Sequence, residues 1–155
     1  MEKSVFITGA TVNTGLGIAE KFAKEGYNLF LGSRNAENAE KTAKELSEKY
    51  GVYAKGYGMK IFDEENTKEI FTDIKNSGYS VDTLVLNAAN LGIRQQFFDV
   101  SIDDFMNVIN TNIGWNFMLS REAAIQMKEN GGGSIVFVNS NTAYRAIPDR
   151  IAYSA

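Results

Sequence analysis

The chain has 155 residues with 44% hydrophobic and 23% charged positions, which is the size and balance of one globular domain. Its 16 basic and 19 acidic side chains give a net charge of −3 without a block of like charge, so we expect no nucleic-acid partner. The absence of cysteine excludes disulfides and thiolate metal sites, and the absence of histidine excludes the commonest catalytic base. Any chemistry must therefore use Ser, Tyr, Lys, Asn or carboxylate side chains.

The sequence also predicts that the chain does not associate with a membrane. No apolar run approaches the roughly 20 residues that span a bilayer. The N-terminus leads directly into a strand-like segment and has no apolar region or cleavage site of a secretion signal. We therefore predict a cytoplasmic location.

Short apolar runs alternate with longer amphipathic stretches, which is the pattern of βαβ units around a parallel sheet. The apolar runs predict strands at residues 4–8, 28–33, 52–59, 83–87 and 134–139. The amphipathic stretches predict helices at residues 16–25, 36–50, 66–77 and 102–129. No internal repeat or linker interrupts this order, so the sequence predicts a single α/β domain over residues 1–155.

A glycine-rich turn, Gly9 to Gly17, follows the first strand and leads into the first helix. A strand, a glycine turn and a helix together hold phosphate, because the free N–H groups and the dipole at the helix start favour negative charge. We assign Gly9 to the tight turn, Gly15 to close approach of the backbone to a pyrophosphate, and Gly17 to close packing of helix on strand. Such a stretch by itself can also be only a tight connection.

Several motifs resemble the short-chain dehydrogenase/reductase family. Thr8-Gly9 with Gly15-Leu16-Gly17 resembles its Thr-Gly-x-x-x-Gly-x-Gly fingerprint, although five residues instead of three separate the first two glycines. Asn87-Ala88-Ala89 resembles its Asn-Ala-Gly motif. The resemblance covers the whole chain and implies a Rossmann-type doubly wound parallel sheet of strand order 3-2-1-4-5, without the family's C-terminal strands. It also implies that the chain is the N-terminal part of a longer one-domain enzyme.

The resemblance implies a nicotinamide dinucleotide cofactor. We expect the following residues to contact it: Gly9, Thr14, Gly15, Leu16, Gly17, Ser33, Arg34, Asn35, Ile61, Asn87, Ala88, Ala89 and Tyr153. The family places an aspartate on the adenine after the third strand, but Lys60 stands at that position here. Lysine cannot accept a hydrogen bond from the adenine amino group, so Ile61 is left to pack on the ring.

The end of the second strand bears on the choice between NAD(H) and NADP(H). Enzymes of this fold that use NAD place an acidic residue there, which binds the ribose 2′-hydroxyl. Ser33 occupies this place and Arg34 follows it, offering a planar cation that can pair with a 2′-phosphate. We therefore predict that NADP(H) is preferred, although Arg34 can also be read as a solvated arginine at a helix start.

The resemblance implies three catalytic residues, Asn112, Ser140 and Tyr153. Tyr153 follows Ser140 by 13 positions, as the family's tyrosine follows its serine. Hydride transfer to a carbonyl carbon leaves negative charge on the carbonyl oxygen. Tyr153 would protonate this oxygen and Ser140 would hold it by a hydrogen bond. Asn112 would position a water in a proton relay. A free tyrosine has a pKa near 10, which is too high for efficient proton transfer at pH 7, so a neighbouring cation must lower it. The family uses a lysine four positions after its tyrosine. That position, 157, lies beyond the last residue of this sequence.

These observations predict an NADP(H)-dependent oxidoreductase that interconverts an alcohol and a ketone or aldehyde. The alternative is a non-catalytic NADP(H)-binding or sensing module, since fold alone does not decide function. Sugars, polyols, oxoacyl groups and steroids all remain open as substrates. We expect the substrate pocket to include Leu91, Arg94, Asn141, Tyr144 and Ile147.

The long predicted helix at residues 102–129 is also a candidate face for a homodimer or homotetramer. Phe105, Ile109, Trp115 and Phe117 make this helix more apolar than one buried stripe requires. The resemblance points to the same helix.

Overall fold

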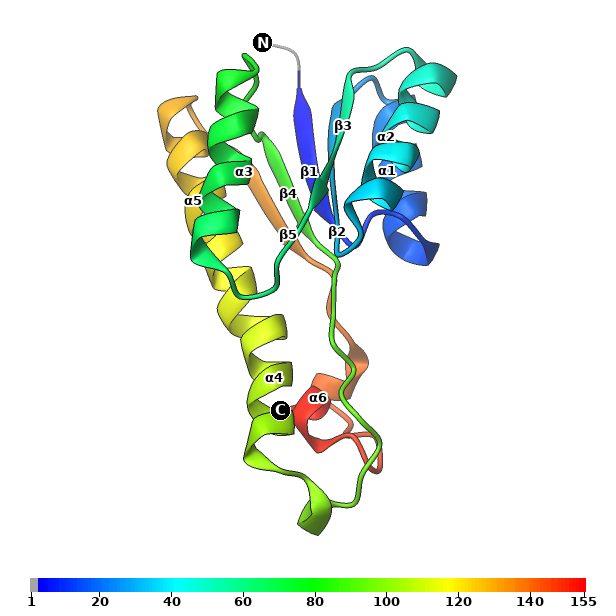
Figure 1. Cartoon of the computed structure of the whole chain (residues 1–155), viewed down its shortest axis with the longest axis vertical. Helices are drawn as coiled ribbons and strands as arrows, with labels where there is room; N and C mark the ends of the chain where they lie inside the picture. The colour runs from blue at the N-terminus through cyan, green and yellow to red at the C-terminus, as the bar shows by residue number, and fades with distance from the viewer. Residues whose placement is uncertain (1–2) are drawn as a thin grey trace.

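A five-stranded parallel sheet forms the centre of the computed structural model, which describes residues 3–155 (Figure 1). Its strands are β1 (Ser4–Thr8), β2 (Asn28–Ser33), β3 (Ala54–Gly58), β4 (Thr83–Leu86) and β5 (Ser134–Phe137). They lie in the order β3-β2-β1-β4-β5 and every neighbouring pair is parallel. The predicted fold class and strand order are therefore confirmed.

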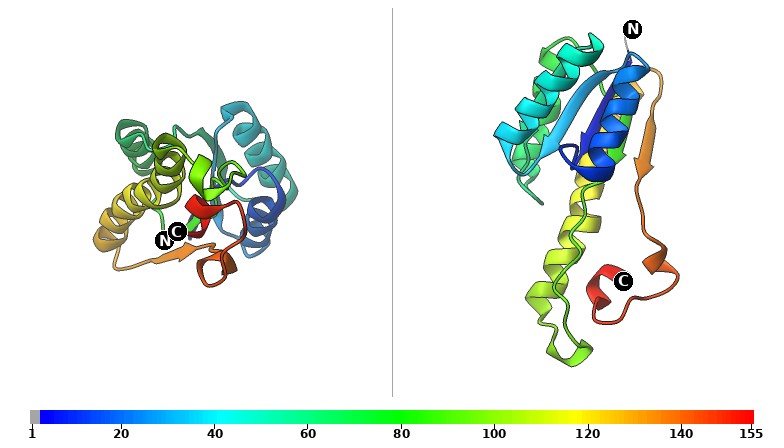
Figure 2. Two further views of the ribbon diagram at one scale, coloured as in Figure 1. Left: turned by 90° about the horizontal axis from the view of Figure 1, so that it is seen from below. Right: turned by 90° about the vertical axis from the view of Figure 1, so that its right-hand side faces the viewer.

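Two layers of helices cover the sheet. α1 (Asn13–Lys24) and α2 (Ala36–Tyr50) lie on one face, and α3 (Glu64–Asn76) and α5 (Asn116–Glu129) lie on the other (Figure 1). α4 (Ile102–Ile109), a π-helical segment (Asn110–Trp115) and α5 form one continuous rod, which was predicted as a single helix. α4 and the short α6 (Ile151–Ser154) extend beyond the carboxyl ends of the strands (Figure 2).

The strands alternate their side chains between two apolar cores, as the period of two requires. Phe6, Phe30 and Leu84 belong to the core under α3 and α5, whereas Ile7 and Leu31 belong to the core under α1 and α2. All five are fully buried. Burial on both faces explains why these strands read as continuous apolar runs in the sequence.

Side-chain caps fix where three helices begin. Asn35, Asp63 and Ser101 precede α2, α3 and α4, and each accepts a hydrogen bond from the backbone N–H three residues later. The loops after β2 and β3 lie at the carboxyl edge of the sheet, because both strands are parallel to β1. The first helix begins at Asn13, three residues before its predicted start, so part of the predicted glycine turn is helical.

Two further findings concern the described residues as a whole. No helix within residues 3–155 is long and apolar enough to cross a membrane. The same residues contain no cluster of carboxylates that could hold a metal ion.

Candidate functional site

A cleft of about 1150 Å³ opens at the carboxyl ends of β1 to β4. Ligands bind at this edge of open α/β sheets, at the point where the strand order reverses. In this sheet that point lies between β1 and β4. The cleft brings together nine of the predicted cofactor residues: Gly9, Thr14, Gly15, Ser33, Arg34, Ile61, Asn87, Ala88 and Ala89. Leu16, Gly17, Asn35 and Tyr153 do not line it.

The glycine turn differs from its predicted arrangement. A Cβ atom added at Gly15 would lie 2.0 Å from the carbonyl oxygen of Gly9, whereas one at Gly17 would meet nothing within 4 Å. Gly15 therefore allows the start of α1 to pack closely on the turn after β1, and the assignment of the close-packing role to Gly17 was wrong. The N–H of Leu16 donates to the carbonyl of Val12 at 3.2 Å, so this group is occupied within the chain.

Asn13 explains the unusual spacing of the glycines. Its φ of 48° lies in the left-handed region, which asparagine tolerates better than most residues. With Asn13 at the place of the second glycine, the turn reads Thr-Gly-x-x-x-Asn-x-Gly over residues 8–15 and has the family's spacing. The turn is not two residues longer than that fingerprint, and Asn13, which lines the cleft, is a site residue that the sequence analysis missed.

The loop after β4 is tied to the end of β1. The N–H groups of Asn87 and Ala88 each donate to Thr8 Oγ1 at 3.0 Å. Asn87 Nδ2 donates back to the carbonyls of Thr8 and Gly9 at 3.1 and 3.2 Å. Because the amide nitrogen of Asn87 is used in this way, the side chain holds the glycine turn in place at the floor of the cleft.

The end of β2 presents one cation to the cleft. Arg34 is exposed, lines the cleft, and has no hydrogen bond or ion pair with any residue in the described range 3–155. Ser33 Oγ accepts a hydrogen bond from the N–H of Asn35 at 3.3 Å. The side chain of Asn35 caps α2 by accepting from the N–H of Asn38 at 2.9 Å, so Asn35 positions this corner and does not itself face the cleft.

The segment after β3 forms the wall opposite the glycine turn. Met59, Ile61 and Phe62 line the cleft there. Asn66 holds this segment: its Oδ1 accepts from the N–H of Lys60 at 2.8 Å, and its Nδ2 lies 3.5 Å from the carbonyl oxygen of Gly58. The Lys60 side chain does not line the cleft, so the wall is apolar where the family has an aspartate.

The three predicted catalytic residues meet at a second cavity of about 480 Å³. Asn112 comes from the π-helical segment, Ser140 from the loop after β5, and Tyr153 from α6. Ala88 and Ala89 line both cavities, which places the end of β4 between them. Ser140 Oγ accepts from the N–H of Thr142 at 3.2 Å, so its own hydrogen is free to be donated.

The side-chain amide of Asn112 makes two hydrogen bonds to the backbone of Asn90. Its Oδ1 accepts from the N–H of Asn90 at 2.8 Å, and its Nδ2 donates to the carbonyl of Asn90 at 2.9 Å. The carbonyl of Asn112 accepts a hydrogen bond from Asn116 Nδ2 at 2.8 Å. The side chain of Asn112 therefore anchors the loop after β4.

The predicted substrate-pocket residues are not gathered in one place. Leu91 lines the large cleft, but Arg94, Asn141, Tyr144 and Ile147 line neither cavity. Tyr144 is 97% exposed. Conversely, the π-helical segment contributes Thr111 and Trp115 to the large cleft, although neither was predicted as a site residue. Only a sequence pattern that indicated the change of helical pitch could have predicted them.

The residues present fit a dinucleotide. The first turn of α1 provides N–H groups without intrahelical partners, and the space that a Cβ at Gly15 would fill is kept open beside Gly9. Arg34 supplies a cation at one end of the cleft, and Ala88 and Ala89 connect its other end to the cavity of Ser140 and Tyr153. A cofactor bound along this cleft would reach from phosphate-binding groups to proton-donating groups.

Comparisons with known proteins agree with this geometry. The family model for short chain dehydrogenases matches residues 3–155. The 3-oxoacyl-[acyl-carrier-protein] reductase FabG of Aquifex aeolicus is 30% identical over 98% of this chain and 61% of its own length. The chain thus spans about three fifths of that curated relative.

Two solved structures share the fold over nearly the whole chain. One is an alcohol dehydrogenase from Thermococcus sibiricus complexed with 5-hydroxy-NADP (TM-score 0.90, 28% identity, covering 99% of this chain and 65% of that one). The other is an NAD+-bound xylitol dehydrogenase (TM-score 0.89, 30% identity, covering 98% and 58%). Since the family model covers all the described residues, the chain belongs to the short-chain dehydrogenase family.

Proposed function

We propose that this chain carries the cofactor site and part of the catalytic site of an NADP(H)-dependent oxidoreductase that interconverts an alcohol and a ketone or aldehyde. The observation that carries the preference for NADP(H) is the end of β2. Ser33 stands there in place of a carboxylate, and Arg34, which has no ion pair within residues 3–155, lines the cleft. Arg34 would pair with the 2′-phosphate, which an acidic side chain would repel. A structural relative that binds 5-hydroxy-NADP supports this choice, while the NAD+-bound xylitol dehydrogenase marks the alternative.

Within this proposal, the bound cofactor supplies the hydride-transfer chemistry. The hydroxyl of Tyr153 donates a proton to the carbonyl oxygen of the substrate in the reducing direction and takes it back in the oxidising direction. Ser140 donates a hydrogen bond that holds the same oxygen. Asn112 fixes the loop at Asn90 through its side chain.

The cofactor preference is tested by measuring the affinities of the purified chain for NADPH and NADH. We expect Arg34→Ala to weaken NADPH binding by about 10-fold to 100-fold, as expected for a charge-assisted hydrogen bond, and to leave NADH binding nearly unchanged. Ser33→Asp should shift the preference toward NADH. The control is Lys41→Ala, which removes a positive charge whose side chain is 75% exposed elsewhere on α2. Equal loss for both cofactors in Arg34→Ala would rule out the 2′-phosphate contact.

Catalysis is tested separately from binding. Turnover of a carbonyl panel with NADPH by the native-length protein that is abolished by Tyr153→Phe, with NADPH affinity retained, would support the oxidoreductase. Tight NADPH binding by the native-length protein without turnover of any carbonyl would instead favour the second candidate, a non-catalytic binding module. Ala89 in the Asn-Ala-Gly motif and Lys60 at the adenine position are the departures from the family that favour this candidate.

The remaining expectations concern assembly and location. A homodimer or homotetramer through α4 and α5 stays a proposal, supported by the exposure of Phe117 at 64%. Trp115 cannot contribute to that face, because it is 2% exposed and packs in the core between the sheet and α5. The cytoplasmic location remains a prediction from the sequence.

A further inference from the structure

Arg150 joins two segments that lie far apart in the sequence. Its Nη1 group donates one hydrogen bond to the carbonyl of Leu91 at 2.6 Å and another to the carbonyl of Gly92 at 3.1 Å. Arg150 directly precedes α6, which carries Tyr153, whereas Leu91 and Gly92 belong to the loop after β4. The two bonds therefore fasten the start of the tyrosine helix to the loop that borders the large cleft.

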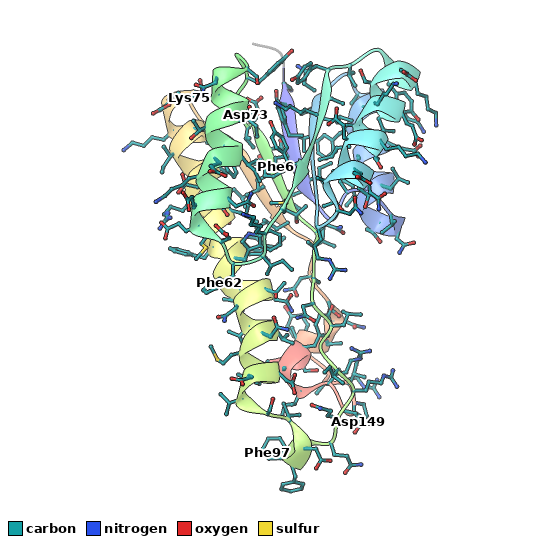
Figure 3. All side chains as sticks on the ribbon, viewed as in Figure 1. Phe6, Phe62, Asp73, Lys75, Phe97 and Asp149 are labelled. Atoms are coloured by element: carbon teal, nitrogen blue, oxygen red, sulfur yellow. The ribbon has the colours of Figure 1, made fainter. Side chains whose placement is uncertain are left out.

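The backbone beside Arg150 strengthens this connection. The carbonyl of Asp149 accepts a hydrogen bond from the N–H of Gln95 at 3.0 Å, and Figure 3 shows Asp149 beside the extended segment that follows β4. Among residues 150–155, only the side chain of Arg150 makes a hydrogen bond to a residue before position 147. The polar connection between α6 and the loop after β4 therefore comes from Arg150 and from the backbone of Asp149.

The loop is also held on its other side. Asn112 bonds to the backbone of Asn90, as described above, and Gly92 packs closely on α4. A Cβ atom added at Gly92 would lie 3.0 Å from Cγ2 of the buried Val108, and the φ of Gly92 is 66°. The loop therefore presents its two carbonyl oxygens at a fixed place. A planar guanidinium group, which always carries its charge, suits two neighbouring acceptors of this kind.

Arg150 lies between the two cavities of the site. Arg150, Leu91 and Tyr153 line one small pocket together. Leu91 also lines the large cleft, and Tyr153 also lines the second cavity, whereas Arg150 lines neither of these two. Reduction of a carbonyl needs a hydride at its carbon and a proton at its oxygen, so the cofactor and the tyrosine hydroxyl must keep one relative position. Arg150 connects the elements that set this position.

We propose that Arg150 is a positioning residue, which holds Tyr153 at the correct distance from the cofactor cleft. This inference rests on the proposed oxidoreductase function and adds a residue that acts on the reaction through α6 and the loop after β4. Displacement of a reacting group by about 1 Å can lower a rate by up to about 100-fold. Loss of the two Arg150 hydrogen bonds should therefore lower turnover more than cofactor affinity.

The first test is steady-state turnover of a carbonyl panel with NADPH by the native-length protein. We expect Arg150→Ala to lower kcat by about 10-fold or more and to change KM for NADPH by less than about twofold. Added guanidinium ion, at a concentration far below that which unfolds proteins, should restore part of kcat, because it can bond to the same two carbonyls. Arg145→Ala is the matched control, since the exposed Arg145 side chain has no hydrogen bond or ion pair within residues 3–155.

The kinetic results decide between positioning and a general structural role. An unchanged kcat in Arg150→Ala would overturn the inference and leave the proposed function standing. Absence of any recovery with guanidinium, or a rise in KM for NADPH as large as the fall in kcat, would also overturn it, because Arg150 would then affect the fold as a whole.

Hydrogen exchange provides a second test that needs no activity. In Arg150→Ala, the N–H groups of Gln95 and Ser154, which bond to the carbonyls of Asp149 and Arg150, should exchange at least about tenfold faster. Exchange in β1 should not change. Unchanged exchange at Gln95 and Ser154 would overturn the inference alone. NADPH binding without turnover by the unaltered native-length protein would instead overturn the proposed catalysis, and the positioning role with it.

Discussion

Thr8 and Asn87 are joined by two hydrogen bonds although they lie 79 positions apart in the sequence. Thr8 Oγ1 accepts from the N–H groups of Asn87 and Ala88, and Asn87 Nδ2 donates to the carbonyls of Thr8 and Gly9. These bonds close the junction between β1 and β4, where the sheet reverses its strand order. The cleft therefore has a rigid floor at the point where the glycine turn and the loop after β4 meet.

We expect Thr8→Val to destabilise the fold by about 2–4 kcal/mol, because valine keeps the shape but leaves two N–H groups without their acceptor. Thr8 is fully buried, so water cannot replace the lost hydroxyl. Urea unfolding followed by circular dichroism measures the change. Thr8→Ser retains the hydroxyl and is the control; equal stability of the two variants would contradict the role given to Thr8 Oγ1.

Gly15 and Gly17 should respond in opposite ways to alanine. Gly15→Ala would place a methyl group 2.0 Å from the carbonyl oxygen of Gly9 and 2.7 Å from Asn87 Nδ2, both parts of the rigid floor. We expect a loss of several kcal/mol of stability together with loss of cofactor binding. Gly17→Ala meets open space inside a helix and should raise stability by about 0.5–1 kcal/mol. Thermal unfolding of both variants is the measurement. Destabilisation by Gly17→Ala would contradict the open space found at Gly17 and would mean that Gly17, too, is needed for close packing.

Asn13 should tolerate glycine but not alanine. Its φ of 48° costs an alanine about 1 kcal/mol or more, whereas glycine adopts it freely. We therefore expect Asn13→Gly to match or exceed the stability of the unaltered chain and Asn13→Ala to lower it. Differential scanning calorimetry on the two variants checks this order, and the opposite order would mean that Asn13 does not stand at a glycine position.

The carboxylate of Asp73 makes stability depend on pH. Hydrogen bonds from Lys55 Nζ and Tyr57 Oη, each 2.7 Å long, hold the pKa of Asp73 below its ordinary value. A lowered pKa in the folded state means that this stabilisation is present above the unfolded pKa of about 4 and is lost as the pH falls through the folded pKa. Because the side chain is 45% exposed, we expect the contribution to be about 1 kcal/mol or less.

The measurement is the free energy of unfolding of the unaltered chain and of Asp73→Asn at pH 7 and pH 3. The difference between the two proteins should shrink at pH 3. Asp99→Asn is the control, since the side chain of Asp99 has no hydrogen bond or ion pair with any other described residue. A constant difference across pH would show that the charge of Asp73 does not contribute.

The sequence by itself determined the elements and their order. β1, β2 and α2 have exactly their predicted bounds, because apolar runs bounded by glycine and a 3.6-residue stripe depend only on neighbouring residues. The strand order followed from the family resemblance, and the three predicted catalytic residues do reach one cavity. Their roles remain predictions.

Only the tertiary structure decided which residues surround the site and how they are held. Asn13 was missed because its importance lies in a backbone angle. Gly17 was given the role of Gly15 because only the three-dimensional distance to the carbonyl oxygen of Gly9 distinguishes the two glycines. The pairing of Asn112 with Asn90 joins positions 22 residues apart, and the contact of Phe62 with Gly114 joins the loop after β3 to the π-helical segment. Such contacts arise when separate segments pack against one another, so no local pattern of residues encodes them.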